Sequence, residues 1–172
     1  MITRRAALAL APALFAAPAR AGAGEWRLSA PRPIAFAVYD RHGRVHDVGS
    51  FAGRPTLAHF WASWCVGCRE EFAALEALQR DMRGEGLRIA AISIDRLGWP
   101  VIDRTVENLG LAEVELFHDL NREATLATGV DRLPTTIVLD PAGREVARAL
   151  GAIDWDARVT REQLRVLIAP RG

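Results

Sequence analysis

The sequence of 172 residues contains no lysine, so all 22 of its basic residues are arginines. This absence excludes chemistry that depends on a lysine amine, such as Schiff bases and the phosphate-binding lysine of a Walker motif. Only two cysteines are present, which excludes a small fold held together by several disulfides. No apolar run reaches the roughly 18–20 residues of a confident membrane span.

Acidic and basic residues are nearly balanced. The 22 arginines and 21 acidic residues give a formal net charge of +1, and half of all residues are hydrophobic. Domains that bind nucleic acid usually carry a basic excess, so the balance gives no sign of such a partner. Disordered chains combine low hydrophobicity with a large net charge. We therefore expect one folded domain over residues 25–170, preceded by a targeting segment.

Residues 1–21 have the composition of an export signal. Arg4 and Arg5 form a short positive start, residues 6–17 are small and apolar, and Ala21 ends a small-x-small cleavage pattern, with Ala17-Pro18-Ala19 as the competing site. The alternative is a buried N-terminal helix, which the prolines in this segment would interrupt. The paired arginines fit either the secretory or the twin-arginine route. The sequence thus predicts a periplasmic or otherwise exported protein, anchored in the membrane if the signal stays uncleaved, whose cysteines meet an oxidising compartment.

The distribution of apolar residues predicts alternating strands and helices. Short apolar runs indicate strands at residues 34–38, 45–48, 56–61, 87–94, 116–118, 135–139 and 145–150. Helical periodicity, with glycine or proline at the ends, indicates helices at residues 65–82, 100–108, 122–128 and 160–168. This order predicts an α/β fold in which helices cover both faces of a mixed sheet.

Cys65 and Cys68 lie where the predicted strand at residues 56–61 gives way to a helix. Two cysteines three apart at a helix start can close a disulfide across one turn. The helix N-terminus stabilises a thiolate through its dipole and unpaired amides, which lowers the pKa of the first cysteine. A Cys-x-x-Cys pair beside a βαβ pattern is a specific redox signal. We therefore predict that Cys65 is the nucleophile and that Cys68 resolves the mixed disulfide.

Three other roles for the cysteine pair are weaker. A tetrahedral zinc site needs four ligands, and the chain has no second cysteine pair; of its four histidines, only His42 and His46 come close to a zinc-ligand spacing. Two buried structural thiols are unusual at a helix start that follows a strand. A permanent disulfide over four residues constrains an unfolded chain far less than one that closes a long loop.

A helical wheel of residues 65–82 places one carboxylate among apolar side chains. Cys68 and Glu71 fall inside the apolar stripe, whereas other charged side chains fall outside it and are expected in solvent: Arg69, Glu70 and Glu76. Burial is costly for a carboxylate and raises its pKa. We predict that Glu71 relays a proton to or from Cys68. The alternative is that Glu71 reaches the surface or pairs with an arginine.

Two segments together resemble a known family. The run from Phe60 to Phe72, FWASWCVGCREEF, resembles the active-site segment of the TlpA/ResA-like thiol-disulfide oxidoreductases of the thioredoxin superfamily. The run from Gly129 to Thr136, GVDRLPTT, with the turn at residues 140–143, resembles their second signature. The resemblance implies a thioredoxin fold: a central mixed sheet flanked by helices, with an N-terminal β-hairpin and a central βα insertion at residues 87–108.

The resemblance also implies functional residues and partners. It implies a cis peptide bond at Pro134, packed against the disulfide, and a substrate-binding surface that includes Trp64, Leu133 and Pro134. Glu71 matches the active-site glutamate of ResA-like members. The implied activity is reduction of disulfides in client proteins, without a cofactor. We expect a monomer whose partners are those clients and a thiol protein that donates electrons.

Several positions leave alternatives open. Val66-Gly67 replaces the proline-containing pairs common in the family, and these two residues tune the redox potential. His59 is either a satisfied core histidine or a second proton-relay group. Because the same fold hosts copper chaperones, Cu(I) binding by the cysteines is an alternative function, with His118 as a distant ligand. A peroxidase of this fold needs a threonine three residues before its reactive cysteine, where this chain has Ala62.

Overall fold

The computed structural model describes residues 24–169, so the predicted export signal lies outside the described residues. Within this part of the chain, no helix is both long enough and apolar enough to cross a membrane. The elements in chain order are β1 (Glu25–Arg32), β2 (Ala37–Tyr39), β3 (Val45–Asp47), the short 3-10 helix η1 (Val48–Phe51), β4 (Thr56–Trp61), α1 (Val66–Asp81), a second 3-10 helix η2 (Arg83–Glu85), β5 (Arg88–Ser93), α2 (Trp99–Leu109), β6 (Glu115–His118), α3 (Glu123–Thr128), β7 (Thr135–Leu139), β8 (Glu145–Leu150) and α4 (Arg158–Ile168).

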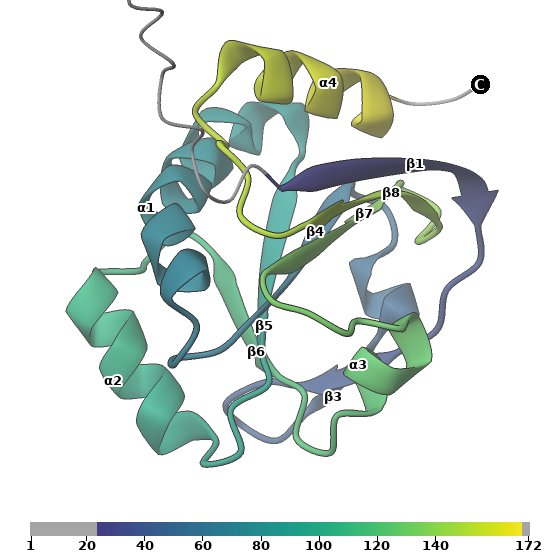
Figure 1. The fold of residues 1–172 in the computed structure, drawn as a ribbon. Helices are drawn as coiled ribbons and strands as arrows, with labels where there is room; N and C mark the ends of the chain where they lie inside the picture. Colours follow the sequence, from purple (N-terminus) through teal and green to yellow (C-terminus); the bar gives the residue numbers. More distant parts are fainter. Residues whose placement is uncertain (1–23, 170–172) are drawn as a thin grey trace, which may run out of the picture.

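The strands form one mixed sheet in the order β1-β8-β7-β4-β5-β6-β2-β3 (Figure 1). β4 lies inside the sheet, where it pairs in parallel with β5 and antiparallel with β7. Every residue of β4 is buried, as its continuous apolar run predicts for a strand covered on both faces. The predicted α/β class is confirmed, and the predicted bounds of β4, β7 and β8 match the structure.

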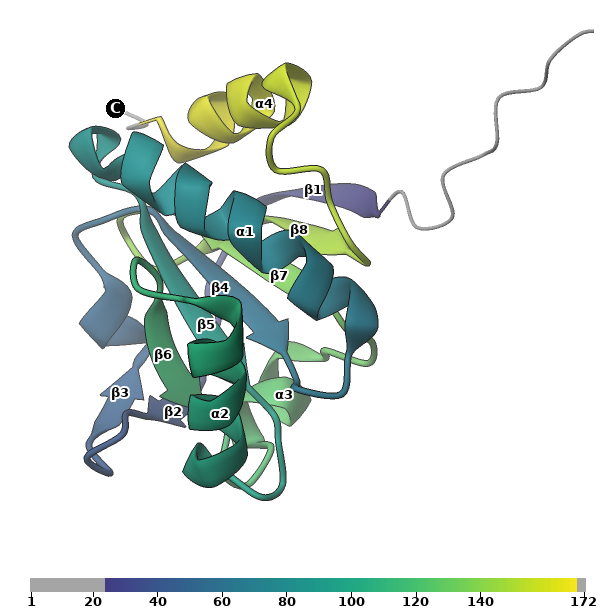
Figure 2. The same ribbon diagram turned by 90° about the vertical axis from the view of Figure 1, so that its left-hand side faces the viewer.

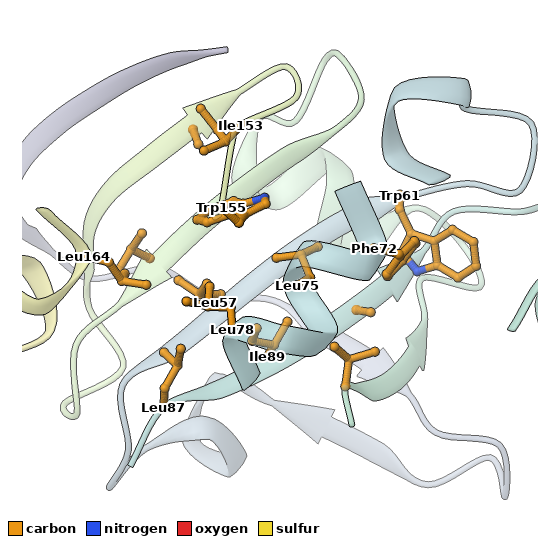
Figure 3. Close-up of a cluster of buried hydrophobic side chains, with 14 of the residues drawn as sticks. Leu57, Trp61, Phe72, Leu75, Leu78, Leu87, Ile89, Ile153, Trp155 and Leu164 are labelled. Carbon is orange, nitrogen blue, oxygen red and sulfur yellow. The ribbon is translucent and has the colours of Figure 1, made fainter. Parts of the chain in front are cut away.

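Alternate residues of β4 face opposite sides of the sheet, so this strand contributes to two cores. Leu57 and Trp61 belong to the larger core, which α1, α2 and α4 cover (Figure 3). Ala58 and Phe60 belong to the second core, which α3 and η1 cover. Figure 2 shows α1 and α2 in front of the sheet, with α3 behind it. The sheet is therefore enclosed between two helical layers.

The hairpin predicted near the N-terminus is formed by β2 and β3. The Asp40 carboxylate holds its turn, because it accepts hydrogen bonds from the backbone N–H groups of His42 and Arg44 at 2.8 and 3.0 Å. β2 joins the sheet through an antiparallel pairing of Tyr39 with His118 in β6. The central βα segment expected at residues 87–108 corresponds to β5 and α2, and β5 lies inside the sheet.

The apolar pattern does not predict β1. Its sequence, EWRLSAPR, has few apolar residues, and most of its side chains are exposed. The strand forms because it pairs antiparallel with β8, with Trp26 opposite Ala149. The indole of Trp26 also lies edge-on to the buried Trp155, with ring centroids 5.9 Å apart. Pairing with an existing sheet edge, rather than its own periodicity, therefore defines this strand.

The expectation that Glu76 lies in solvent is wrong, because only 7% of this residue is exposed. The segment before β6 covers this side of α1 and directs backbone N–H groups at the carboxylate. Glu76 accepts hydrogen bonds of 2.9 to 3.0 Å from the N–H groups of Ala112, Glu113 and Val114. A wheel describes one helix alone and cannot show a loop that packs on its polar side. Arg69 and Glu70 are exposed, as expected.

We predict that Glu76→Gln lowers the free energy of unfolding of the oxidised protein by about 2 kcal/mol, because hydrogen bonds to a buried charged group are among the strongest that mutations remove. The amide –NH₂ that replaces one oxygen would face backbone donors. Guanidinium chloride titration followed by tryptophan fluorescence measures the change. Glu70→Gln, on the exposed side of α1, is the control. Equal stability of both variants would contradict the assigned role of Glu76.

Candidate active site

The two cysteines form a disulfide at the point where the sheet gives way to α1. β4 ends at Trp61, and α1 begins at Val66 with Cys65 as its N-cap. Cys65 and Cys68 are joined by an S–S bond of 2.07 Å. Cys68 is fully buried, whereas Cys65 keeps 8% of its surface exposed. Only the first sulfur is therefore placed for an outside group to reach it.

The start of α1 also favours negative charge on Cys65. The Cys68 N–H donates a hydrogen bond to the Cys65 Sγ at 3.2 Å. The helix dipole and the unpaired amides of the first turn act on the same atom. In the reduced protein these interactions stabilise a Cys65 thiolate, which is the nucleophilic form of the side chain.

The loop before Cys65 is held by an aspartate that the sequence reasoning missed. The Asp95 carboxylate accepts hydrogen bonds from the Ser63 backbone N–H at 2.8 Å and from the Ser63 hydroxyl at 2.7 Å. Trp61 and Ser93 are register partners in the parallel pair β4 and β5. Ser63 and Asp95 each follow two residues later, so they meet at the same sheet edge. This matching offset was the sequence signal that could have identified the contact.

Glu71 lies in the apolar stripe of α1, as the helical wheel predicts, and only 6% of it is exposed. Its Oε2 accepts a hydrogen bond from the Ile153 backbone N–H at 3.0 Å, whereas Oε1 has no hydrogen-bond partner among residues 24–169. Burial raises the pKa of Glu71 from 4.5 to about 7, although the Ile153 N–H and the nearby Trp155 side chain oppose part of the rise. The carboxyl group neither reaches the surface nor pairs with an arginine.

His59 is a second buried titratable group near Glu71. Its Nδ1 lies 2.9 Å from the Thr136 hydroxyl and 3.5 Å from Glu71 Oε1, and the second distance exceeds a normal hydrogen bond. Its Nε2 has no hydrogen-bond partner in the described part of the chain. Burial lowers the pKa of His59 to about 3, so the ring is neutral near neutral pH. The structure therefore favours a core histidine with one satisfied nitrogen over a charged partner for Glu71.

The second signature segment reaches the disulfide from the neighbouring strand. The peptide bond between Leu133 and Pro134 is cis, as the resemblance implies. Pro134 lies beside the first turn of α1. If Gly67 carried a Cβ atom, that atom would stand 3.8 Å from the Cδ of Pro134. Trp64, Cys65 and Leu133 line one surface hollow of about 430 Å³. The structure thus brings Trp64 and Leu133 into one hollow with Cys65 and places Pro134 against the first turn of α1.

The copper alternative finds no ligand cluster in the described residues. Residues 24–169 contain no group of three or more histidine, cysteine, aspartate or glutamate side chains placed to hold a metal ion. His118 is buried, and its Nε2 lies 2.9 Å from the Asp95 carbonyl oxygen. The proposed distant ligand is therefore already engaged in the fold.

A disulfide at a helix start, beside a cis proline that precedes a strand, places this chain among proteins with the thioredoxin fold. The chain belongs to the AhpC/TSA family, whose profile matches residues 30–161. The thioredoxin domain of a thiol-disulfide oxidoreductase from Bacteroides vulgatus has a TM-score of 0.67 at 20% identity, covering 80% of this chain and 98% of that chain. StoA from Bacillus subtilis has a TM-score of 0.62 at 18% identity, covering 78% and 96%. These identities support a shared fold only.

Curated relatives are named as thiol-disulfide proteins. The thiol-disulfide oxidoreductase ResA of Geobacillus thermodenitrificans is 28% identical over 111 residues, which is 63% of this chain and 62% of the relative. ResA of Bacillus subtilis is 23% identical over 118 residues, covering 69% and 65%. The thiol:disulfide interchange protein HelX of Rhodobacter capsulatus is 31% identical over 108 residues, covering 60% and 56%. The chain therefore spans less than two thirds of the length of these relatives.

We predict that Glu71 destabilises the oxidised protein as the pH rises. Its folded pKa lies above its ordinary value, so the folded state favours the protonated form. Stability is then highest below about pH 4.5 and falls until the carboxyl ionises near pH 7. At about 1.4 kcal/mol for each tenfold change in acidity, the loss amounts to about 3 kcal/mol.

Glu71→Gln should remove this loss, because the amide oxygen still accepts the Ile153 N–H but carries no charge. The variant should match wild type near pH 4 and exceed its unfolding free energy by about 3 kcal/mol near pH 8. Guanidinium chloride unfolding at about pH 4, 6 and 8 measures the difference, with Glu70→Gln as the exposed control. A difference that does not vary with pH would show that Glu71 ionises freely in the folded protein.

Proposed function

We propose that this chain is an exported thiol-disulfide oxidoreductase that reduces disulfides in client proteins. The observation that carries the proposal is the Cys65–Cys68 disulfide at the N-terminus of α1, with one sulfur buried and the other open to a hollow. The names of the relatives support the same chemistry. A peroxidase function is not favoured, because Ala62 has no hydroxyl where such enzymes need a threonine.

The reaction begins from the reduced protein. The Cys65 thiolate attacks one sulfur of a client disulfide, a new S–S bond joins Cys65 to the client, and the other client sulfur leaves as a thiolate that takes up a proton. Cys68 then loses its proton, and its thiolate attacks the Cys65 sulfur. The Cys65–Cys68 disulfide forms, and the second client sulfur leaves and is protonated. Two electrons and two protons thus pass to the client.

Glu71 supplies a proton acceptor for the second step. It lies three residues after Cys68 on the same helix, inside the same apolar stripe. With a pKa of about 7, its carboxyl group is part ionised near neutral pH and can take up a proton or return it. The oxidised protein must then be reduced by a thiol protein before it can act again.

The surface around the exposed sulfur is suited to a polypeptide. Trp64 is 67% exposed beside Cys65, Leu133 lines the same hollow, and the buried Pro134 lies next to Gly67 in the first turn of α1. An exposed tryptophan offers a large apolar contact at little conformational cost. We propose that Trp64, Leu133 and Pro134 hold the client segment that contains the target cysteine.

Wild-type reduced protein should reduce a protein disulfide, such as those of insulin, and Cys65→Ser should lower the rate at least a hundredfold, because the attacking thiolate is gone. Cys68→Ser should instead accumulate a mixed disulfide through Cys65, because no second thiolate resolves it. Mass spectrometry of the trapped species identifies the linked cysteine.

Alkylation provides an independent assignment of the two thiols. In the reduced wild-type protein, iodoacetamide should modify Cys65 before Cys68 across the pH range, because Cys65 keeps 8% of its surface accessible and lies at the helix N-terminus, whereas Cys68 is fully buried. Preferential modification of Cys68, or a mixed disulfide that passes through it, would reverse the assigned roles.

Export is supported by residues 1–21 alone. We expect the mature chain, recovered from the periplasm of a Gram-negative host, to begin at Gly22, because cleavage follows the small-x-small pattern that ends at Ala21. N-terminal sequencing and intact mass measure the cleavage site. Ala21→Arg should slow processing, whereas Ala13→Leu, within the apolar run and outside both small-x-small patterns, serves as the control. An intact Met1 on soluble protein would contradict the proposal.

A further inference from the structure

We infer that the groove beside Cys65 recognises client segments that carry acidic side chains next to the target cysteine, and that Arg96 and Arg122 bind those carboxylates. The inference rests on the proposed function and adds a substrate class to it. Its basis is the shape of the surface around Trp64 and the charge that this surface leaves unpaired.

Two hollows, each of about 430 Å³, meet at Trp64. One contains Cys65 and Leu133, and the other extends away from the sulfur to Arg96 and Leu97. Trp64, Ile94 and Arg122 line both hollows, so the surface is one groove with the reactive sulfur in one half. An extended segment that presents a cysteine to Cys65 can therefore continue along Trp64 into the second half.

The acidic side chains of the groove are already engaged. Asp95 is 4% exposed, and its carboxylate is held by Ser63 and by the Ser93 hydroxyl at 2.8 Å. Asp131 pairs with Arg132 at 3.4 Å. These contacts account for every carboxylate that lines the two hollows.

Arg96 and Arg122 are exposed, and no carboxylate of residues 24–169 lies within ion-pair distance of either one. Most other arginines in this part of the chain do form ion pairs. The groove thus presents two guanidinium groups without internal partners. Guanidinium groups bind carboxylates through two parallel hydrogen bonds, and the apolar walls formed by Trp64 and Ile94 limit competition from water.

The backbone at Arg122 adds a second observation. Arg122 has φ of 60° and ψ of 21°, the left-handed region, and among residues 24–169 every other residue with positive φ is a glycine. Glycine or asparagine is the usual residue in this conformation, because a larger side chain crowds the backbone there. Its side chain makes no capping hydrogen bond to α3. Strain of this kind is typical of residues kept for binding, and this one faces both halves of the groove.

The test uses three peptides of one length, each with a single cysteine disulfide-bonded to 2-nitro-5-thiobenzoate. The residues that flank the cysteine are aspartates, asparagines or lysines. Mixing with reduced protein releases the yellow thiol, and its absorbance gives the second-order rate constant. For wild type we expect the aspartate peptide to react about tenfold faster than the asparagine peptide at low salt, and the ratio to fall toward one at about 0.5 M salt.

Variants assign the preference to the two arginines. Arg122→Gln and Arg96→Gln should each reduce the ratio of the aspartate-peptide rate to the asparagine-peptide rate several-fold. The double variant with Arg122→Glu and Arg96→Glu should react fastest with the lysine peptide. A ratio of two rates cancels any common effect of lost charge on the acidity of Cys65. Arg104→Gln is the matched control, because Arg104 is also exposed and without an ion pair in the described residues but lies on α2 outside the groove.

The outcomes separate the inference from the proposed function. Exchange with all three peptides at equal rates would overturn the inference and leave the redox function standing. An acidic preference that survives both glutamine variants would overturn the assignment to Arg96 and Arg122. Failure of every peptide to react with reduced wild-type protein would instead count against the proposed function itself.

Discussion

β4 is covered on both faces, so the chain can leave it only at the edge of the sheet, after Trp61. The first turn of α1 must therefore begin at that edge, with its unpaired amides directed at Cys65. Asp95, at the matching offset after β5, fixes the intervening loop through Ser63. The reactivity of one sulfur thus depends on the burial of a strand that carries no reactive group.

The same helix buries two glutamates with opposite consequences. Glu76 accepts hydrogen bonds from consecutive backbone N–H groups, so its negative charge is satisfied where it lies. Glu71 accepts one, from Ile153, and its other oxygen has no hydrogen-bond partner within residues 24–169. The number of donors, rather than the depth of burial, separates a carboxylate that stabilises the fold from one that can exchange a proton.

Much of this arrangement could be predicted from the sequence, because it follows from local patterns. A continuous apolar run located β4, helical periodicity placed Glu71 among apolar side chains, and the cysteine spacing located the reactive site. What escaped prediction depends on distant segments. β1 exists because β8 offers it an edge, and the burial of Glu76 comes from a loop more than one helix away along the chain. Periodicity carries no information about such partners.

The position of β1 has a consequence for how the sheet is completed. The register joins Glu25, near the first described residue, to Leu150, close to the end of the last strand. A nascent chain that has not reached β8 therefore leaves β1 without its partner strand. The pairing of β1 with β8 joins residues far apart in the sequence, and contacts of this kind slow folding. Until β8 has been synthesised, the unpaired edge of β7 is available to other strands, so the interval between the synthesis of β7 and that of β8 is the one in which this edge can aggregate.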